Sequence, residues 1–307
     1  MNKAIITGST GLIASGVVEC LLDNNIEVVA LGRRSIKESR LKHLSDHSSL
    51  TYLQLEMSEI ESLPQLLKEN NWSIGSDCVF YHFAWSGDSR LADGSVQDQY
   101  NNVTYSSNAV IVAQELGCEK FINAGSQEEK FVDRYLKSHW TKQSYHSNMG
   151  VYGSAKVSAR DMCLLLAYLK KIDYVHTRIS VIFEESLETN NYVNSVLKKI
   201  KSGETFDPPM NHQLFDFISK EECAKVYYHL GQSGQNKSDY FVGSGNPMTL
   251  HEFFNEFSLQ TKGAKVEGLE APASDNRILN KEDFDISELI HHIGFQPNSP
   301  NFNHTNQ

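Results

Sequence analysis

The sequence predicts an α/β fold with a doubly wound parallel sheet, and three observations lead to this prediction. The chain starts with a short apolar run, Lys3-Ala4-Ile5-Ile6, that leads directly into a glycine-containing turn at residues 7–11. Helical and strand patterns then alternate through the first half of the chain, which is the order that builds a parallel sheet covered by helices. Residues 78–84 are almost continuously apolar, as is typical of a strand buried on both faces. We therefore expect ligands to bind at the carboxyl ends of the strands.

The turn Thr7-Gly8-Ser9-Thr10-Gly11 is predicted to open a nucleotide-binding βαβ unit. Gly8 lets the chain turn sharply after the strand, and Gly11 lets backbone N–H groups approach a pyrophosphate. The apolar stretch Leu12 to Leu22 forms a helix whose positive end points at that charge. Ala14 takes the place of a third glycine, where a methyl group is accepted. The residues expected to bind the dinucleotide here are Thr7, Gly8, Thr10, Gly11, Leu12 and Ile13.

The end of the second predicted strand indicates which dinucleotide binds. The run Glu27 to Leu31 is followed by Gly32-Arg33-Arg34-Ser35. An NAD site usually has a carboxylate about 20 residues after the glycines for the ribose 2′-hydroxyl, whereas an arginine suits a 2′-phosphate. Because two guanidiniums and no carboxylate stand here, we expect Arg33 and Arg34 to select NADP(H), with NAD(H) as the alternative.

The remaining elements of the amino-terminal half continue the alternation. Apolar spacing and turn residues predict a short helix within 36–48, a strand at 50–55, a helix at 60–67, a helix at 97–116, a strand at 120–124, a helix at 151–171 and a strand at 174–181.

The carboxyl-terminal half is less regular. Helices are expected at 192–200, 221–230 and 250–259, with a short strand at 215–218. We predict three parts: a Rossmann-like dinucleotide-binding domain at residues 1–180, a smaller α/β region at 181–297 that mainly binds substrate and returns some segments to the sheet, and a disordered tail at 298–307.

Charge and cysteine content exclude several classes of protein. The 28 basic and 38 acidic residues give a net charge of −10, which argues against nucleic acid or an anionic membrane as the main partner. The five scattered cysteines lie mostly in apolar runs, as expected in a reducing compartment, and indicate neither a disulfide framework nor a metal site. No apolar run approaches the ~18 residues that cross a bilayer. These observations predict a cytoplasmic protein without a bound metal.

Tyr152 and Lys156 stand four residues apart in the helix predicted at 151–171, so they share one face. A tyrosine alone titrates near about pH 10, and a neighbouring lysine cation stabilises its phenolate for proton transfer. Ser126 follows the strand that ends at Ala124, where a hydroxyl group can polarise a carbonyl oxygen. We predict that Ser126, Tyr152 and Lys156 are catalytic and that Lys156 also binds a cofactor ribose.

These residues resemble the extended short-chain dehydrogenase/reductases, the group of nucleotide-sugar epimerases, dehydratases and 4-ketoreductases. The resemblance spans nearly the whole chain and covers residues 7–14, His82-Phe83-Ala84-Trp85, Asn102, Ser126, Tyr152, Lys156, residues 178–183, 215–224, 241–250 and 293–297. It implies cofactor contacts from Phe83, Ala84, Trp85, Asn102 and Ile179, and from Glu56 and Met57 at the adenine.

Three departures from the family pattern affect what the resemblance implies. Glu56-Met57 replaces the usual Asp and small apolar neighbour beside the adenine. Glu129-Lys130-Phe131 replaces a Tyr-Gly pair that commonly follows the serine. Dehydratases of the group place an acidic pair directly after the catalytic hydroxyl, whereas here Gln127 intervenes before Glu128 and Glu129.

The resemblance leaves the reaction open. A reductase needs only the triad and a dissociable cofactor, and Arg33-Arg34 favours this reaction over an NAD-dependent nucleotide-sugar 4-epimerase. A dehydratase is a weaker alternative because it needs an additional acid and base. Residues 125–128 are also similar to those of 4-keto-deoxysugar reductases. A non-catalytic dinucleotide sensor would typically have lost the tyrosine or the lysine, and both are present.

The expected substrate is a nucleoside-diphosphate sugar. Its predicted contacts are Trp85, Ser126, Gln127, Asn190, Asn191 and, for the diphosphate, Arg277. The resemblance also implies a homodimer, joined through a four-helix interface of the helices at 97–116 and 152–171. The sequence does not identify the base, the sugar or the stereochemistry of the product.

Overall fold

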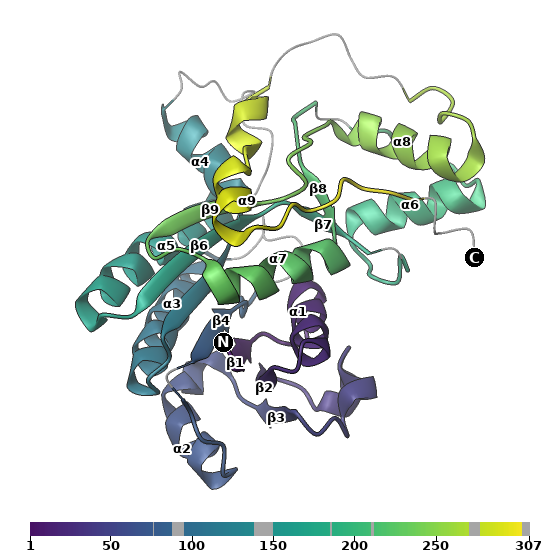
Figure 1. The fold of residues 1–307 in the computed structure, drawn as a ribbon. Helices are drawn as coiled ribbons and strands as arrows, with labels where there is room; N and C mark the ends of the chain where they lie inside the picture. Colours follow the sequence, from purple (N-terminus) through teal and green to yellow (C-terminus); the bar gives the residue numbers. More distant parts are fainter. Residues whose placement is uncertain are drawn as a thin grey trace.

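The structure is a computed structural model of the chain. It describes residues 1–75, 77–87, 95–137, 150–184, 186–209, 212–269 and 277–302, without the side chains of residues 135 and 137. Figure 1 shows a central sheet with helices on both faces and a smaller group of elements beside it, built from the carboxyl-terminal half of the chain.

The sheet has seven strands in the order β3-β2-β1-β4-β5-β6-β9. The strands are β1 (Lys3–Thr7), β2 (Glu27–Gly32), β3 (Leu50–Gln54), β4 (Cys78–His82), β5 (Lys120–Ser126), β6 (Asp173–Ile179) and β9 (Ser238–Val242). All neighbouring pairs are parallel. The strand order reverses direction between β1 and β4, and ligands bind at such switch points in open α/β sheets. The predicted doubly wound sheet is therefore confirmed.

Successive residues of the strands enter two different cores. Ala4 and Ile6 of β1 pack on the face covered by α1 (Leu12–Asp23) and α7 (Lys220–Ser233). Ile5 packs on the opposite face, which is covered by α2 (Leu63–Glu69), α3 (Val96–Glu115) and α5 (Gly150–Lys170). Because both faces are buried, the strands need apolar residues at nearly every position, which explains the continuous run in β4.

A smaller group of elements lies at one end of the sheet (Figure 1). It contains the parallel pair β7 (Val181–Phe183) and β8 (Phe217–Ser219), with α6 (Tyr192–Ser202) packed against α8 (Leu250–Lys262). Phe217 and Phe253 stack at 3.9 Å between ring centres and anchor α8 on β8. The short helices η4 (Lys281–Phe284) and α9 (Ser287–Ile293) follow, and α9 packs against α7.

The Asp216 carboxylate connects the segment before β8 to the turn after β9. It accepts hydrogen bonds from Ser244 N at 2.8 Å, Ser244 Oγ at 2.7 Å and Gly245 N at 2.7 Å, and it is fully buried. A Cβ on Gly243 would lie 2.7 Å from this carboxylate, so only glycine leaves room for it. The smaller group of elements is therefore tied to the main sheet by a buried polar contact.

Several parts of the chain differ from the expected elements. Helix α4 (Glu128–Lys137) follows β5 where no helix was expected, and residues within 36–48 form two 3-10 turns, η1 (Ile36–Glu38) and η2 (Lys42–Leu44). The prediction of a disordered tail is wrong for residues 298–302, because Phe302 is 1% exposed and packs against Phe183 and Phe257. Residues 303–307 lie outside the described part of the chain.

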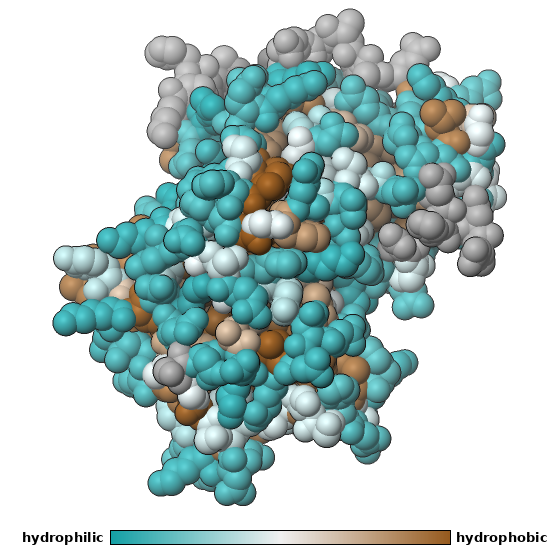
Figure 2. Space-filling model, in the orientation of Figure 1, coloured by the Kyte–Doolittle hydropathy of each residue, from teal (hydrophilic) through white to brown (hydrophobic). Residues whose placement is uncertain are grey.

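The surface agrees with the charge balance of the sequence. Figure 2 shows a face covered mostly by hydrophilic residues, with apolar residues scattered or in small groups. Within the described ranges, none of the helices combines the length and the apolar character that crossing a bilayer requires.

Candidate active site

A groove of about 350 Å³ opens at the carboxyl ends of β1, β2 and β4. Eleven of the residues predicted to bind the cofactor line it: Gly8, Thr10, Gly11, Arg33, Arg34, Glu56, Met57, Phe83, Ala84, Trp85 and Asn102. Six further residues line the groove and were not predicted to do so: Leu31, Gly32, Leu55, Ser58, Ser86 and Tyr105. Most of these are direct neighbours of predicted residues, so the positions of the strand ends could have identified them.

The glycine turn has the geometry that a diphosphate requires. Gly8 has φ +65°, and a Cβ there would lie 2.7 Å from the Ala84 backbone. Gly11 is the N-cap of α1 and makes no side-chain cap hydrogen bond, so the first N–H groups of the helix remain available as donors to an anion. These features fit a dinucleotide cofactor. Leu12 and Ile13 form the first turn of α1 without lining the groove.

Arg33 and Arg34 are exposed at the edge of the groove, just after β2. Their backbone is held in place by β3, since Tyr52 Oη donates to Arg34 O at 2.6 Å and Gln54 Nε2 donates to Arg33 O at 3.2 Å. The two guanidiniums are therefore open to an anionic group that enters this end of the groove. Glu56 lines the same groove, after β3.

An ion pair connects the loop after β2 to the segment after β7. Arg40 Nη1 lies 3.2 Å from Glu184 Oε1, and Arg40 Nη2 donates to Thr189 Oγ1 at 2.8 Å. The Glu184 carboxylate is almost completely buried, so the contact is partly shielded from water. The loop after β2, which carries Arg33 and Arg34 at the groove, is thus joined directly through Arg40 to the segment that begins the smaller group of elements.

A buried hydrogen-bond chain fixes the end of β4. Thr7 Oγ1 lies 2.9 Å from His82 Nδ1, and His82 Nε2 lies 3.0 Å from Ser106 Oγ. The Ser106 hydroxyl donates to Asn102 O at 2.8 Å, so it accepts from His82 Nε2, and His82 Nδ1 accepts from Thr7. Burial lowers the pKa of His82 to about 3. The imidazole is therefore neutral at physiological pH and serves as a connector between β1 and α3.

Asn102 and Gln99 of α3 hold the loop that follows β4. Asn102 Nδ2 donates to Ser86 O at 2.8 Å, and Asn102 Oδ1 accepts from Ser86 N at 2.7 Å. Trp85 Nε1 donates to Gln99 Oε1 at 2.9 Å. The role of Asn102 in this structure is therefore to fix the loop backbone that forms one wall of the groove.

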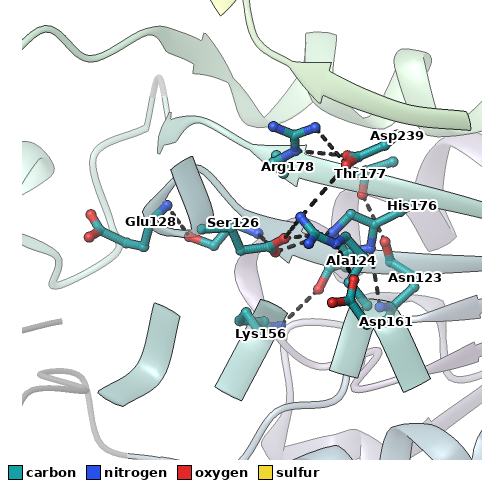
Figure 3. A network of polar contacts seen from close by, with 12 residues as sticks. Asn123, Ala124, Ser126, Glu128, Lys156, Asp161, His176, Thr177, Arg178 and Asp239 are labelled. Atoms are coloured by element: carbon teal, nitrogen blue, oxygen red, sulfur yellow. Dashed lines mark hydrogen bonds and ion pairs between the residues drawn. The ribbon is translucent and has the colours of Figure 1, made fainter. Parts of the chain in front are cut away.

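The three predicted catalytic residues come together beside the groove. Ser126 ends β5, while Tyr152 and Lys156 lie on α5. Lys156 Nζ donates to Ala124 O at 2.8 Å, as Figure 3 shows, and lies 3.8 Å from the centre of the Trp85 ring. It also lies 5.7 Å from the centre of the Tyr152 ring. The sequence prediction thus located three groups that the fold does bring together.

The charges at this site differ from the sequence expectation. Burial lowers the pKa of Lys156 to about 7, while the Glu129 carboxylate acts in the opposite direction. We expected Lys156 to lower the pKa of Tyr152, but burial raises that pKa and a hydrogen bond with Ser126 opposes the rise. The reason is that burial penalises the phenolate, and Glu129 and Glu128 add negative charge nearby. The phenol is therefore protonated at neutral pH.

Gln127 and Glu128 are buried directly after the serine. Burial raises the pKa of Glu128 to about 7. Within the described part of the chain, Glu128 Oε2 and Gln127 Oε1 have no hydrogen-bond partner. Glu128 N donates to Ser126 Oγ at 3.2 Å, and Figure 3 shows the Glu128 side chain pointing away from Lys156. Gln127 was predicted to contact substrate, whereas Glu128 was not; its burial could not be inferred from its charge.

The other predicted substrate residues lie farther along the chain. Asn190 is exposed, and Asn191 Oδ1 accepts from Asn194 N at 2.7 Å, so it caps α6. Arg277 lines a cavity of about 620 Å³ together with Lys281 and Glu252, and in the described ranges this cavity shares no lining residue with the groove. Ile179 is buried at the end of β6. The structure thus places Arg277 and the groove in separate cavities.

Comparison with known proteins identifies the family to which the sequence is similar. Residues 4–243 match the model of the NAD dependent epimerase/dehydratase family. Two curated relatives are called CDP-abequose synthase. The one from Salmonella muenchen is 21% identical over 85% of this chain and 81% of its own length, and the one from Yersinia pseudotuberculosis is 21% identical over 91% and 93%.

Solved structures show the same fold. The UDP-glucose 4-epimerase of Thermotoga maritima, solved with UDP-glucose, has a TM-score of 0.74 at 15% identity, covering 99% of this chain and 96% of its own. The dTDP-glucose 4,6-dehydratase of Bacillus anthracis, solved with NAD, has a TM-score of 0.74 at 14% identity, covering 99% and 94%. The predicted resemblance to this group of proteins is therefore confirmed.

Proposed function

Because the chain belongs to the NAD dependent epimerase/dehydratase family, we propose that it uses NADPH to reduce a 4-keto (deoxy)sugar nucleotide to the 4-hydroxy sugar nucleotide. The observation that carries this proposal is the gathering of Ser126, Tyr152 and Lys156 beside a groove that ends in two exposed arginines. Arg33 and Arg34 suit the 2′-phosphate of NADP(H), and NAD(H) remains the alternative cofactor.

The protein groups around the ketone have complementary tasks. Tyr152 donates its hydroxyl proton to the 4-keto oxygen, and its raised pKa keeps the phenol protonated until the oxygen gains charge. The Ser126 hydroxyl holds the same oxygen by a hydrogen bond. The Lys156 ammonium stabilises the phenolate that forms, and it is available in protonated form below about pH 7. When bound, the dinucleotide supplies the hydride.

The substrate class is supported by the relatives and by the residues that follow the serine. Two curated relatives carry the name CDP-abequose synthase, which favours a deoxysugar nucleotide. Gln127 replaces the first residue of the acidic pair that dehydratases place after the hydroxyl, so a reaction without elimination of water is favoured. The proposed contacts of the sugar are Trp85, Ser126 and Gln127. The proposed contacts of the rest of the sugar nucleotide are Asn190, Asn191 and Arg277.

An NAD-dependent nucleotide-sugar 4-epimerase is the second candidate. It is favoured by solved neighbours, such as the Bacillus cereus UDP-glucuronic acid 4-epimerase solved with NAD, which has a TM-score of 0.75 at 15% identity. A dehydratase is less favoured because of Gln127. A dinucleotide sensor is the candidate outside enzymes, and the complete set of catalytic residues argues against it.

The decisive experiment measures cofactor oxidation with defined substrates. The purified protein is incubated with NADPH or NADH and a panel of CDP-, dTDP- and UDP-linked 4-keto-6-deoxy sugars, and absorbance at the nicotinamide band is followed. We expect oxidation of NADPH with at least one 4-keto sugar nucleotide. Tightly bound NAD after purification, with interconversion of 4-hydroxy epimers and no net oxidation, would instead establish the epimerase. Binding of NADPH without either reaction would establish the sensor.

We also propose a cytoplasmic homodimer. Helix α5 exposes an apolar stripe at helical spacing, formed by Met162, Leu165, Tyr168 and Leu169, which are 44–67% exposed. The family resemblance implies a four-helix interface of α3 and α5, and a second copy of this chain would cover the stripe. Five free cysteines, four of them buried, are consistent with a reducing compartment.

A further inference from the structure

Glu129 is a carboxylate without solvent exposure at the start of α4, three residues after Ser126. Its Oε1 accepts a hydrogen bond from Ser126 N at 2.9 Å. Its Oε2 lies 2.9 Å from His176 Nε2. An unpaired buried charge is costly. The contacts of the Glu129 carboxylate with the Ser126 amide and the His176 imidazole therefore offset part of the cost of burying it.

His176 is held from both of its ring nitrogens, and one of them contacts Glu129. Asn123 Nδ2 lies 3.3 Å from His176 Nδ1, and Tyr174 Oη donates to Arg160 O at 3.3 Å. Asn123 Nδ2 and Tyr174 Oη both face Nδ1 of His176, so Nε2 is the ring nitrogen that faces the Glu129 carboxylate.

The nearest cation is shared with other carboxylates. Arg160 Nη1 lies 3.7 Å from Glu129 Oε2 and 3.9 Å from Asp239 Oδ2, while Arg160 Nε pairs with Asp161 at 2.8 Å. Asp239 is already bound by Arg178 Nε at 2.7 Å and Nη2 at 2.6 Å. Figure 3 shows this cluster on the side of Ser126 opposite to Glu128. Glu129 is thus the member of the cluster that contacts the backbone of the catalytic strand.

Gly125 makes the space that the Glu129 carboxylate occupies. A Cβ at this position would overlap Glu129 Oε1 and would lie 2.5 Å from both His176 Nε2 and Thr177 O. The φ of Gly125 is not in the left-handed region, so the glycine is required by the close approach of the carboxylate and not by the backbone conformation. The absence of a side chain at Gly125 therefore leaves the space at the end of β5 that the Glu129 carboxylate fills.

We propose that Glu129 is a positioning residue that acts through Ser126 and Lys156: its carboxylate fixes the Ser126 backbone N–H, two residues from the Ala124 carbonyl that holds Lys156 Nζ, and it places a buried acidic group at this end of β5. Its importance for the reaction rests on the proposed function, whereas its effect on Lys156 does not. The sequence has Glu129 where the family commonly has a tyrosine-glycine pair, so this arrangement would be a property of this chain.

The sign of the electrostatic effect follows from the surroundings of Lys156. Burial lowers the pKa of Lys156 to about 7, and the negative charge of Glu129 raises it. Removing that charge must lower the pKa further, because the ammonium loses a favourable interaction. The other titratable and charged groups that face Lys156 or Glu129 are Tyr152, Arg160, Asp161 and Cys163 on α5, Glu128 on α4, His82 on β4, Tyr174, His176 and Arg178 on β6, and Asp239 on β9.

Trp85 provides a readout of Lys156 that requires no turnover. The ammonium lies 3.8 Å from the centre of the indole ring, so its protonation changes the emission of Trp85. The other tryptophans, Trp72 and Trp140, are replaced by phenylalanine so that Trp85 alone emits. Emission of the full chain, without added dinucleotide, is then titrated from pH 5 to pH 10 in this background. The change in emission with pH that is missing in the Lys156→Met variant is assigned to Lys156, and its midpoint is the quantity compared between variants.

Glu129→Gln keeps the size and an acceptor oxygen but removes the charge. We expect its transition to move to lower pH by about one unit, the lower end of the effect of an opposite charge at close range. The matched control is Glu128→Gln, which removes the neighbouring carboxylate that does not bond to Ser126 N. We expect this control to move the transition by much less than Glu129→Gln does. An unchanged midpoint in Glu129→Gln, or an equal shift in both variants, would overturn the proposal.

Glu129→Asp is a second variant, in case the glutamine variant does not fold. It retains the charge but shortens the side chain, so Oε1 no longer reaches Ser126 N. We expect faster hydrogen–deuterium exchange of the Ser126 amide together with a retained Lys156 transition. Unchanged protection of that amide would show that Glu129 does not hold the strand end. If NADPH turnover is absent in all proteins while these shifts occur, the proposed function fails and the role of Glu129 stands.

Discussion

The ammonium group of Lys156 lies 3.8 Å from the centre of the Trp85 indole ring, and the same ring meets the Tyr152 ring edge-on at 5.8 Å. Trp85 also lines the groove at the ends of β1, β2 and β4. This indole therefore contacts two of the proposed catalytic residues and also lines the proposed dinucleotide groove. A ligand that fills the groove up to Lys156 must contact it.

Tyr152→Phe removes the proposed proton donor without removing the ring that packs on Trp85. We expect kcat for reduction of the 4-keto sugar nucleotide to fall about 10²- to 10⁴-fold, the usual size of a lost general acid. The affinity for NADPH, measured by fluorescence titration, should stay within a factor of about two. Tyr168→Phe on the same helix is the control, because Tyr168 is 67% exposed. Equal activity of Tyr152→Phe and the parent would remove Tyr152 from the mechanism.

Replacing Arg33 and Arg34 together by serine tests the choice of cofactor. Each guanidinium can give charge-assisted hydrogen bonds to a 2′-phosphate, so NADPH should bind about 10- to 100-fold more weakly, while NADH binding should hardly change. Kd values for both dinucleotides are measured by calorimetry. Lys37→Ser is the matched control, since Lys37 is exposed in η1 but does not line the groove. Parallel losses for NADPH and NADH would contradict selection of the phosphate.

Glu128→Gln should stabilise the protein in a pH-dependent way. Burial raises the pKa of Glu128 from its usual 4.5 to about 7. Between pH 4.5 and about pH 7 the folded state binds more protons than the unfolded state. The contribution of Glu128 to the free energy of unfolding is therefore fully present below pH 4.5 and is lost as pH rises through about 7. A shift of about 2.5 units corresponds to about 3 kcal/mol.

We therefore expect Glu128→Gln to raise the free energy of unfolding by about 3 kcal/mol at pH 8, relative to the parent, and by little near pH 4.5. Urea titrations at several pH values measure this difference. The exposed Glu38→Gln serves as control and should follow the parent at every pH. A constant difference between Glu128→Gln and the parent would show that the carboxylate is not penalised by burial.

Asp216→Asn should destabilise the contact between the segment before β8 and the turn after β9. The Asp216 carboxylate accepts three hydrogen bonds from Ser244 and Gly245. In the asparagine variant, the side-chain N–H groups would point at one or more of these donating groups, and those hydrogen bonds would be lost. We expect a loss of about 2–4 kcal/mol in urea unfolding. The exposed Asp285→Asn, which bonds only within its own turn, should cost much less. Similar losses in both variants would contradict a special role of Asp216.

Arginine at Leu165 and Leu169 tests the proposed dimer. These residues are 53% and 62% exposed on α5, so a charge there should cost the single chain little. If a second copy covers them, the variant should have the mass of one chain, 34.6 kDa, in light scattering, where the parent has twice that mass. Lys170→Glu, on the same helix, is the control. An identical mass for the double variant and the parent would place the interface elsewhere.

Local sequence signals predicted most of the main sheet. Residues 4–6 and 78–81 are apolar on both faces, Gly8 directly follows β1, and Gly117 lies just beyond α3, so the sequence pattern agrees with the positions of these elements. The carboxyl-terminal parts were harder, because their structure depends on distant contacts. Phe302 looked like part of a polar tail until the fold placed it against Phe183 and Phe257.

The candidate site shows the same division. Tyr152 and Lys156 are one helical turn apart, so their proximity follows from spacing alone. The burial of Glu128 and Glu129 does not, because charged residues are rarely buried and only the packing of α4 on α5 puts them there. The prediction for the pKa of Tyr152 was wrong for the same reason: the sequence shows the nearby lysine but not the burial of the phenol.

The contact of Arg40 with Glu184 and Thr189 joins two stretches of chain that are more than 140 residues apart. One of them carries the arginines proposed to choose the coenzyme, and the other opens the portion proposed to hold the sugar. A displacement of either stretch therefore pulls on the other. If binding at the coenzyme end shifts the first stretch, the affinity at the sugar end will change with it, and the kinetics measured for one partner will then depend on how saturated the other is.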